Sequence, residues 1–173
     1  MGIYEHVEIF AGLPVVAADN EEVAVADPGA VAWRISMEEF EAPPEEFQAA
    51  FEQLLQRTGP TGPTALIIGE WGSAYDSSFP YQLLIDNVSR LSGLRALFVG
   101  ELTGEECEIS WIHQADVTPL IEAFPALESL WIRGAESLEL KPVRHEGLRE
   151  LVFQSGACPP RWSVRSPPAI CPT

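Results

Sequence analysis

The sequence predicts an α/β fold built around a parallel sheet, and three observations support this class. Short apolar, β-rich segments alternate with amphipathic helical segments along most of the chain. A leucine phrase recurs in LRALFVG, LESLWIRG and LRELVFQ, which begin at Leu94, Leu127 and Leu148. Alignment of these phrases with an earlier apolar run places four leucines in one register: Leu66, Leu97, Leu130 and Leu151.

Two architectures fit this pattern. Alternating strands and helices predict parallel strands joined by right-handed crossovers. We expect a solenoid in which each strand and its following helix form one repeat, with the helices on the convex side. Units that bury their leucines against one another have a reason to repeat side chains in register. An open doubly wound parallel sheet is the alternative, and it has no such reason.

Local sequence patterns predict each strand and helix in the first half of the chain. LPVVAA at 13–18 reads as a short strand, and VAWRIS at 31–36 alternates as a strand does. A helix is expected next, because a Pro pair at 43–44 and acidic residues suit its first turn, and Gly59 suits its end. Its apolar residues fall on one helical face: Phe47, Ala50, Phe51, Leu54 and Leu55.

The second half continues the alternation. Strands are expected at the β-rich apolar runs 64–71, 94–102, 127–134 and 148–154. A helical stripe covers 77–93, and Thr118 followed by Pro119 caps and begins another helix. The link between the last two strands has no clear helical pattern.

The leucine phrase resembles the leucine-rich repeat, best over Leu91 to Phe153 and more weakly at 64–71 and 31–36. The stretches GELTGEECEISWIHQADVTPL and FAGLPVV also look like an uncharacterised bacterial family of cytoplasmic leucine-rich-repeat proteins. The resemblance implies a solenoid with a binding surface. The chain departs from the repeat pattern because the Asn that closes many such repeats is replaced by Trp71, Leu102, Ala135 and Gly156.

The charge balance excludes some partners. The formal net charge is -16, with 26 acidic against 10 basic side chains. Nucleic acids and anionic membranes favour cationic surfaces, so neither is expected, whereas a basic protein partner would suit this surface. The chain has no apolar run long enough to span a bilayer and no secretory signal, which predicts a cytoplasmic protein. The three cysteines form no disulfide framework.

The composition divides the chain into three regions. Residues 1–30 form an N-terminal segment and a candidate cap, 31–157 the repeat domain, and 158–173 a disordered tail. The tail, CPPRWSVRSPPAICPT, holds five prolines and no acid. Read one base earlier, GC-rich codons for it can encode LPAEVVRAVAASDLPT, which would suit a further repeat. We therefore expect a frameshift or truncation, with a natural disordered tail as the alternative.

The strand pattern predicts one candidate binding face. Side chains alternate along a strand, so one column of the concave face should hold Arg34, Ile67, Phe98, Trp131 and Val152. An exposed Phe98–Trp131 ladder flanked by Arg133 is typical of a protein-binding surface. The alternative is that these aromatic side chains pack under the long loops.

The loops that leave the strands are the second candidate, because ligands in parallel sheets bind beyond the carboxyl ends of the strands. Glu70 and Glu101 should stand together at this edge. One loop carries Tyr75 and Asp76, and the other carries Trp111.

A rival reading is a small metal-binding protein or hydrolase-like enzyme that uses Glu101, Glu106, Cys107 and His113. Their spacing matches no known ligand motif, and the chain has no phosphate-binding loop or nucleophile elbow. No catalytic residue, metal ligand or cofactor is predicted.

We therefore predict a protein–protein interaction module without catalytic activity. Its expected contact residues are Phe98, Trp131, Arg133, Glu70, Glu101 and Trp111. The partner is an unknown protein, and the acidic charge of the chain favours a basic one.

Overall fold

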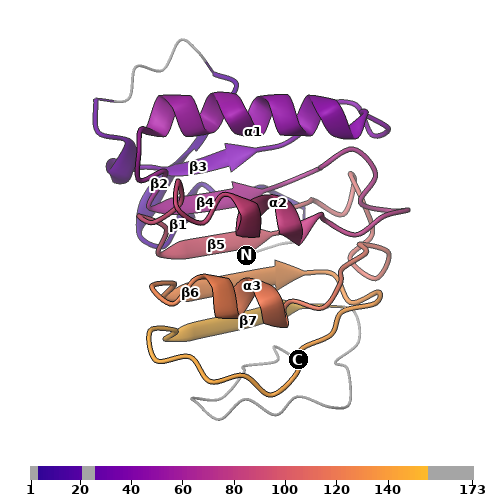
Figure 1. The fold of residues 1–173 in the computed structure, drawn as a ribbon. Helices are drawn as coiled ribbons and strands as arrows, with labels where there is room; N and C mark the ends of the chain where they lie inside the picture. Colours follow the sequence, from indigo (N-terminus) through magenta and orange to yellow (C-terminus); the bar gives the residue numbers. More distant parts are fainter. Residues whose placement is uncertain (1–3, 21–25, 156–173) are drawn as a thin grey trace.

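The computed structural model describes residues 4–20 and 26–155. The expected order of strands and helices is found, with a short strand and a 3-10 helix in addition near the start of the chain (Figure 1). They are β1 (Ile9–Phe10), β2 (Leu13–Ala17), the 3-10 helix η1 (Pro28–Ala30), β3 (Ala32–Ile35), α1 (Pro44–Thr58), β4 (Ala65–Ile68), α2 (Tyr81–Asp86), β5 (Ala96–Val99), α3 (Thr118–Ala123), β6 (Ser129–Arg133) and β7 (Glu150–Gln154). The tail at 158–173 lies outside the described residues.

The strands form one curled sheet in the order in which they occur in the chain. β1 pairs antiparallel with β2, and every later pair is parallel. The predicted register is confirmed, since Leu66, Leu97, Leu130 and Leu151 pair successively across β4 to β7. The fold is therefore an α/β fold with a mostly parallel sheet.

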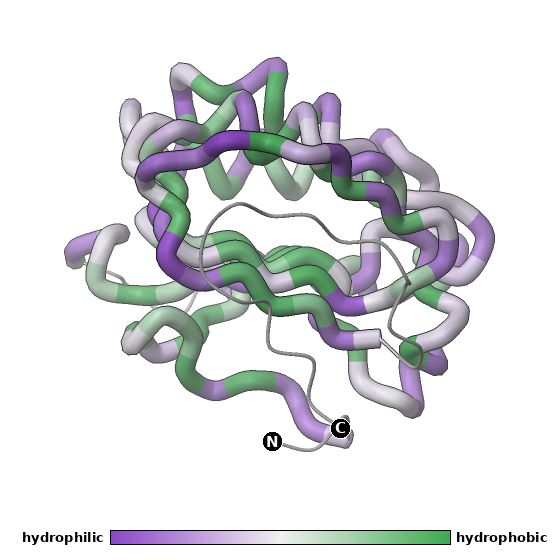
Figure 2. The backbone as a smooth tube through the Cα atoms, turned by 90° about the horizontal axis from the view of Figure 1, so that it is seen from below, coloured by the Kyte–Doolittle hydropathy of each residue, from purple (hydrophilic) through white to green (hydrophobic). Residues whose placement is uncertain are grey.

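The helices α1, α2 and α3 lie on the same face of the sheet (Figures 1 and 2). The predicted face of α1 is confirmed, because Phe47, Phe51, Leu54 and Leu55 are all buried in the main core. Pro44 occupies the first turn, and Gly59 ends the helix at a φ of 78°, a left-handed value that favours glycine. None of the helices in the described ranges is both long and apolar enough to cross a membrane.

The helix expected over 77–93 is shorter than predicted. The α-helix ends at Asp86, and turns continue to Gly93. The Asn87 side chain donates to the Leu83 carbonyl (2.9 Å), and Val88 N bonds to the Ile85 carbonyl three residues back (3.2 Å). Asn competes for backbone partners and 3-10 bonds tighten the last turn, so the regular helix stops here.

The N-terminal segment covers the face of the sheet away from the helices (Figure 2). We call residues 4–10 the strap. Its Val7 and Phe10 are buried in a second core, together with sheet residues Ala32, Ala65, Ile67, Ala96 and Phe98. The strap turns back into β2 through Ala11 and Gly12, both at positive φ (51° and 77°).

This cover corrects one expectation from the sequence. The column from Arg34 to Val152 is in register, but Phe98 is fully buried rather than exposed. The Phe10 ring packs against Phe98 (centroids 5.8 Å apart) and against Trp131 (5.9 Å). Trp131 remains half-buried, and its indole Nε1 donates to the Glu150 carboxylate (2.8 Å).

Candidate functional site

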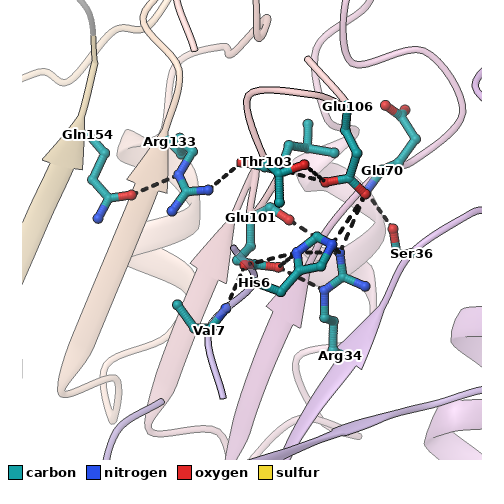
Figure 3. Close-up of polar contacts among 11 residues, drawn as sticks. His6, Val7, Arg34, Ser36, Glu70, Glu101, Thr103, Glu106, Arg133 and Gln154 are labelled. Atoms are coloured by element: carbon teal, nitrogen blue, oxygen red, sulfur yellow. Dashed lines mark hydrogen bonds and ion pairs between the residues drawn. The ribbon is translucent and has the colours of Figure 1, made fainter. Parts of the chain in front are cut away.

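The polar side chains gather at the carboxyl ends of β3 to β6 (Figure 3). Glu70 and Glu101 each follow the glycine that ends a buried strand, β4 and β5. Both were predicted to contact a partner, but both carboxylates are buried. Their hydrogen-bond partners differ, and each carboxylate organises a different part of this edge.

Glu101 is the centre of a buried charge network. Its carboxylate accepts from Arg34 Nε (2.7 Å) and from the Val7 backbone N–H (3.0 Å), and it lies 3.1 Å from His6 Nδ1. A fully buried carboxylate needs such partners, because desolvation of an unpaired charge is costly. Glu101 therefore joins the strap to the ends of β3 and β5.

Glu106 completes this charged cluster, which we define as His6, Arg34, Glu101 and Glu106. Its Oε1 lies 3.4 Å from His6 Nε2 and 4.0 Å from Arg34 Nη2. Its Oε2 accepts from the Thr103 backbone N–H (2.7 Å) and from the Thr103 hydroxyl (3.0 Å). His6 thus lies between two carboxylates, and its Nδ1 also lies 3.1 Å from Arg34 Nη2.

Arg133 is also buried, which corrects its predicted role in an exposed surface. Its Nε donates to Gln154 (2.8 Å), its Nη1 donates to the Leu102 carbonyl, and its guanidinium lies over the Phe98 ring, 5.2 Å from the centroid. Burial lowers the pKa of the Arg133 guanidinium, although the nearby carboxylates act in the opposite direction. Arg133 holds β6, β7 and the loop after β5 together.

Glu70 shapes the loop that follows β4. Its Oε1 accepts the backbone N–H groups of Gly72 (2.8 Å), Ser73 (2.7 Å) and Ala74 (2.9 Å). Its Oε2 is buried without a hydrogen-bond partner among the described residues. The three bonds fix the path of the loop and hence the position of Tyr75, which comes next in the chain.

The rival set of Glu101, Glu106, Cys107 and His113 is divided between different contacts. The two carboxylates meet His6 and Arg34, the Cys107 thiol faces the Glu108 carbonyl (3.6 Å), and His113 Nδ1 lies 3.1 Å from the Trp111 carbonyl. Within the described ranges, no three His, Cys, Asp or Glu side chains are grouped so that they could hold a metal ion.

The environment of the Cys107 thiol predicts how the free energy of unfolding depends on pH. Burial, followed by the charges of Glu70 and Glu108, raises the pKa of this thiol from 9.0 to about 11. The unfolded thiol loses its proton at lower pH than the folded one, so this contribution to the free energy of unfolding is present below about 9 and is lost as pH rises to about 11. In urea unfolding between pH of about 9 and about 11, we expect the free energy of unfolding of Cys107→Ala to fall less than that of the wild type. Parallel curves for the two proteins would contradict the prediction.

Two exposed aromatic side chains form a platform at the same edge. Trp111 is 52% exposed and Tyr75 is 43% exposed. Their rings meet edge to face with centroids 5.4 Å apart. The backbone N–H of His113 donates to the Ala74 carbonyl (2.8 Å), which ties the two loops together. We call Tyr75 and Trp111 the aromatic platform.

The predicted contact residues thus separate into three groups. Trp111 is exposed, Trp131 is half-buried, and the others are buried: Phe98, Arg133, Glu70 and Glu101. Sequence reasoning missed His6, which lies 95 residues from Glu101 in the chain. The apolar pair Val7 and Phe10 was the available signal that this segment packs against the sheet.

The comparisons with known proteins give a fold likeness. No protein-family model and no curated protein matches this chain. Among solved structures, the chain is similar to the crystal structure of a Bacteroides fragilis protein from the Northeast Structural Genomics Consortium, with 26% identity and a TM-score of 0.57. The match covers 72% of this chain and 37% of that protein, so the chain spans little more than a third of its length. The resemblance to leucine-rich repeats remains an expectation.

Proposed function

We propose that the chain is a protein-interaction module that binds a basic segment of a partner on the aromatic platform. One observation carries the proposal: two large aromatic side chains lie exposed and in contact on loops that are fixed to each other. Exposed aromatic side chains held in place are typical of interaction hot spots.

The surroundings of the platform favour a cationic partner. Asp76, Glu105 and Glu108 are exposed in the two loops that carry Tyr75 and Trp111. An arginine or lysine side chain could lie against the indole ring and meet these carboxylates at the same time. The net charge of -16 adds long-range attraction for such a segment.

We also propose that the fold is a leucine-rich-repeat-like solenoid. The sequential strand order, the in-register leucines and the placement of all three helices on one face support it. In such an arrangement the loops after successive strands lie at one edge, which explains why Tyr75 and Trp111 meet although 36 residues separate them.

Titration with an unstructured arginine-rich peptide tests the binding proposal. Trp111→Ala is expected to weaken binding about tenfold, which is typical of the loss of an aromatic anchor. It should leave the thermal midpoint almost unchanged, because Trp111 is exposed. Val88→Ala, at an exposed apolar residue beyond the end of α2, is the matched control and should bind as the wild type does.

Equal binding by Trp111→Ala and the wild type would show that net charge alone attracts the peptide. The platform would then not be the site. A glutamate-rich peptide of the same length should not bind either protein.

A further inference from the structure

The sheet face beneath the strap is apolar. A parallel sheet is ordinarily covered on both faces, and here the helices cover one face while the strap lies over the other. Here the paired positions Ala32, Ala65 and Ala96 form a row of small side chains, and Ile67 and Phe98 form a larger apolar row beside it. Both rows are buried in a core that includes the strap residues Val7 and Phe10.

The strap contacts this face as a bound peptide would. Two side chains three residues apart, Val7 and Phe10, are buried in the second core, whereas Ile9 between them is 65% exposed. The strap pairs with β2 at two positions, and its Glu8 carbonyl also accepts the backbone N–H of Val15 (2.9 Å). Glu101 anchors the strap by polar contacts: its carboxylate accepts the Val7 backbone N–H and lies 3.1 Å from His6 Nδ1 (Figure 3).

The strap also leaves part of the face unfilled. An open pocket of about 170 Å³ lies beside the turn after Phe10. It is lined by both apolar and polar residues: Ala11, Leu13, Thr64, Ala65, Arg95, Ala96, Glu128 and Ser129.

We propose that the strap is an internal occupant of a peptide-binding face, and that a partner segment of the same chemistry takes its place. The partner is an extended segment with an aromatic residue three positions after an aliphatic one, and with a basic residue immediately before the aliphatic one. The aromatic side chain would take the position of Phe10 against Phe98 and Trp131. The basic side chain would take the position of His6 between Glu101 and Glu106, beside the Arg34 guanidinium, whose Nη2 lies 3.1 Å from His6 Nδ1.

The covalent tether explains why the strap occupies the face in the free protein. A tethered segment competes at an effective concentration of about millimolar, so a free segment binds detectably only when the hold of the strap is weakened. Phe10 supplies the largest buried side chain of the strap, and its loss should open the face.

The test uses full-length protein and a labelled peptide of residues 4–12, YEHVEIFAG. Phe10→Ala is expected to bind this peptide at least about tenfold more tightly than the wild type, because the tethered competitor is weakened. Ile9→Ala changes an exposed neighbour in the same strap and should behave as the wild type. A peptide with Phe10→Ala should not bind.

Folding of each variant is checked by circular dichroism. If Phe10→Ala is folded and does not bind the peptide, the proposal is wrong. If Phe10→Ala does not fold, Phe10→Leu replaces it with the same expected order of affinities, and equal binding by Phe10→Leu and Ile9→Ala would overturn the proposal. Trp111→Ala, combined with Phe10→Ala, should leave peptide binding unchanged, which separates this face from the aromatic platform.

Discussion

Replacement of Phe98 by alanine is expected to destabilise the fold by about 3–5 kcal/mol, the usual cost of truncating a large buried aromatic side chain. Phe98 is fully buried, packs against Phe10 and Trp131, and supports the guanidinium of Arg133. Its loss would open a void between the sheet and the strap. Urea unfolding at neutral pH measures the effect.

A control substitution at an exposed apolar residue shows how much of the effect depends on the burial of Phe98. Val88→Ala removes exposed apolar atoms and should change stability by less than about 0.5 kcal/mol. A similarly small effect of Phe98→Ala would mean that Phe98 is exposed, as a binding surface would require. The strap would then not cover this face in solution.

Replacement of Arg34 by methionine is expected to cost about 3 kcal/mol, because it leaves a buried carboxylate with incomplete compensation. The Glu101 side chain has no solvent exposure, and Arg34 Nε is its closest donor at 2.7 Å. Methionine keeps much of the volume of the arginine stem, so the measured change in the free energy of unfolding reports mainly on the lost charge.

The chain offers its own control for this prediction. Arg90 and Glu52 form an ion pair of similar length, 2.6 Å, with both side chains substantially exposed. Arg90→Met should therefore have little effect, since water replaces the lost partner. The double variant Arg34→Met/Glu101→Gln should be more stable than Arg34→Met alone, because glutamine removes the buried charge. Equal effects of Arg34→Met and Arg90→Met would contradict the importance of burial.

The sheet could be predicted because its causes are local and repeated. The spacing of Leu66, Leu97, Leu130 and Leu151 indicated which residues pair, and the pairs occur as expected. The helix α1 has its apolar face and its ending glycine within one continuous stretch. Such signals do not depend on contacts with distant segments.

The cover of the second face could not be predicted in the same way. Val7 N and Glu101 are 94 residues apart in the chain, and no periodic pattern links them. A column of apolar residues such as Ile67 and Phe98 looks the same whether a partner or the chain itself covers it. The platform was found only in part, because Trp111 was chosen for its own chemistry, whereas its contact with Tyr75 depends on how two loops are tied together.

The sequential order of the strands has a consequence for how the chain folds during synthesis. Each strand from β3 onward pairs with the one made just before it, so the sheet can grow in step with the emerging chain. The strap is the exception, because Phe10 is made before Phe98 and Trp131 of β5 and β6, on which it packs. The strap therefore leaves the ribosome before the strands that it covers and finds its place only after them. Until then the growing sheet presents an apolar face that other proteins can meet.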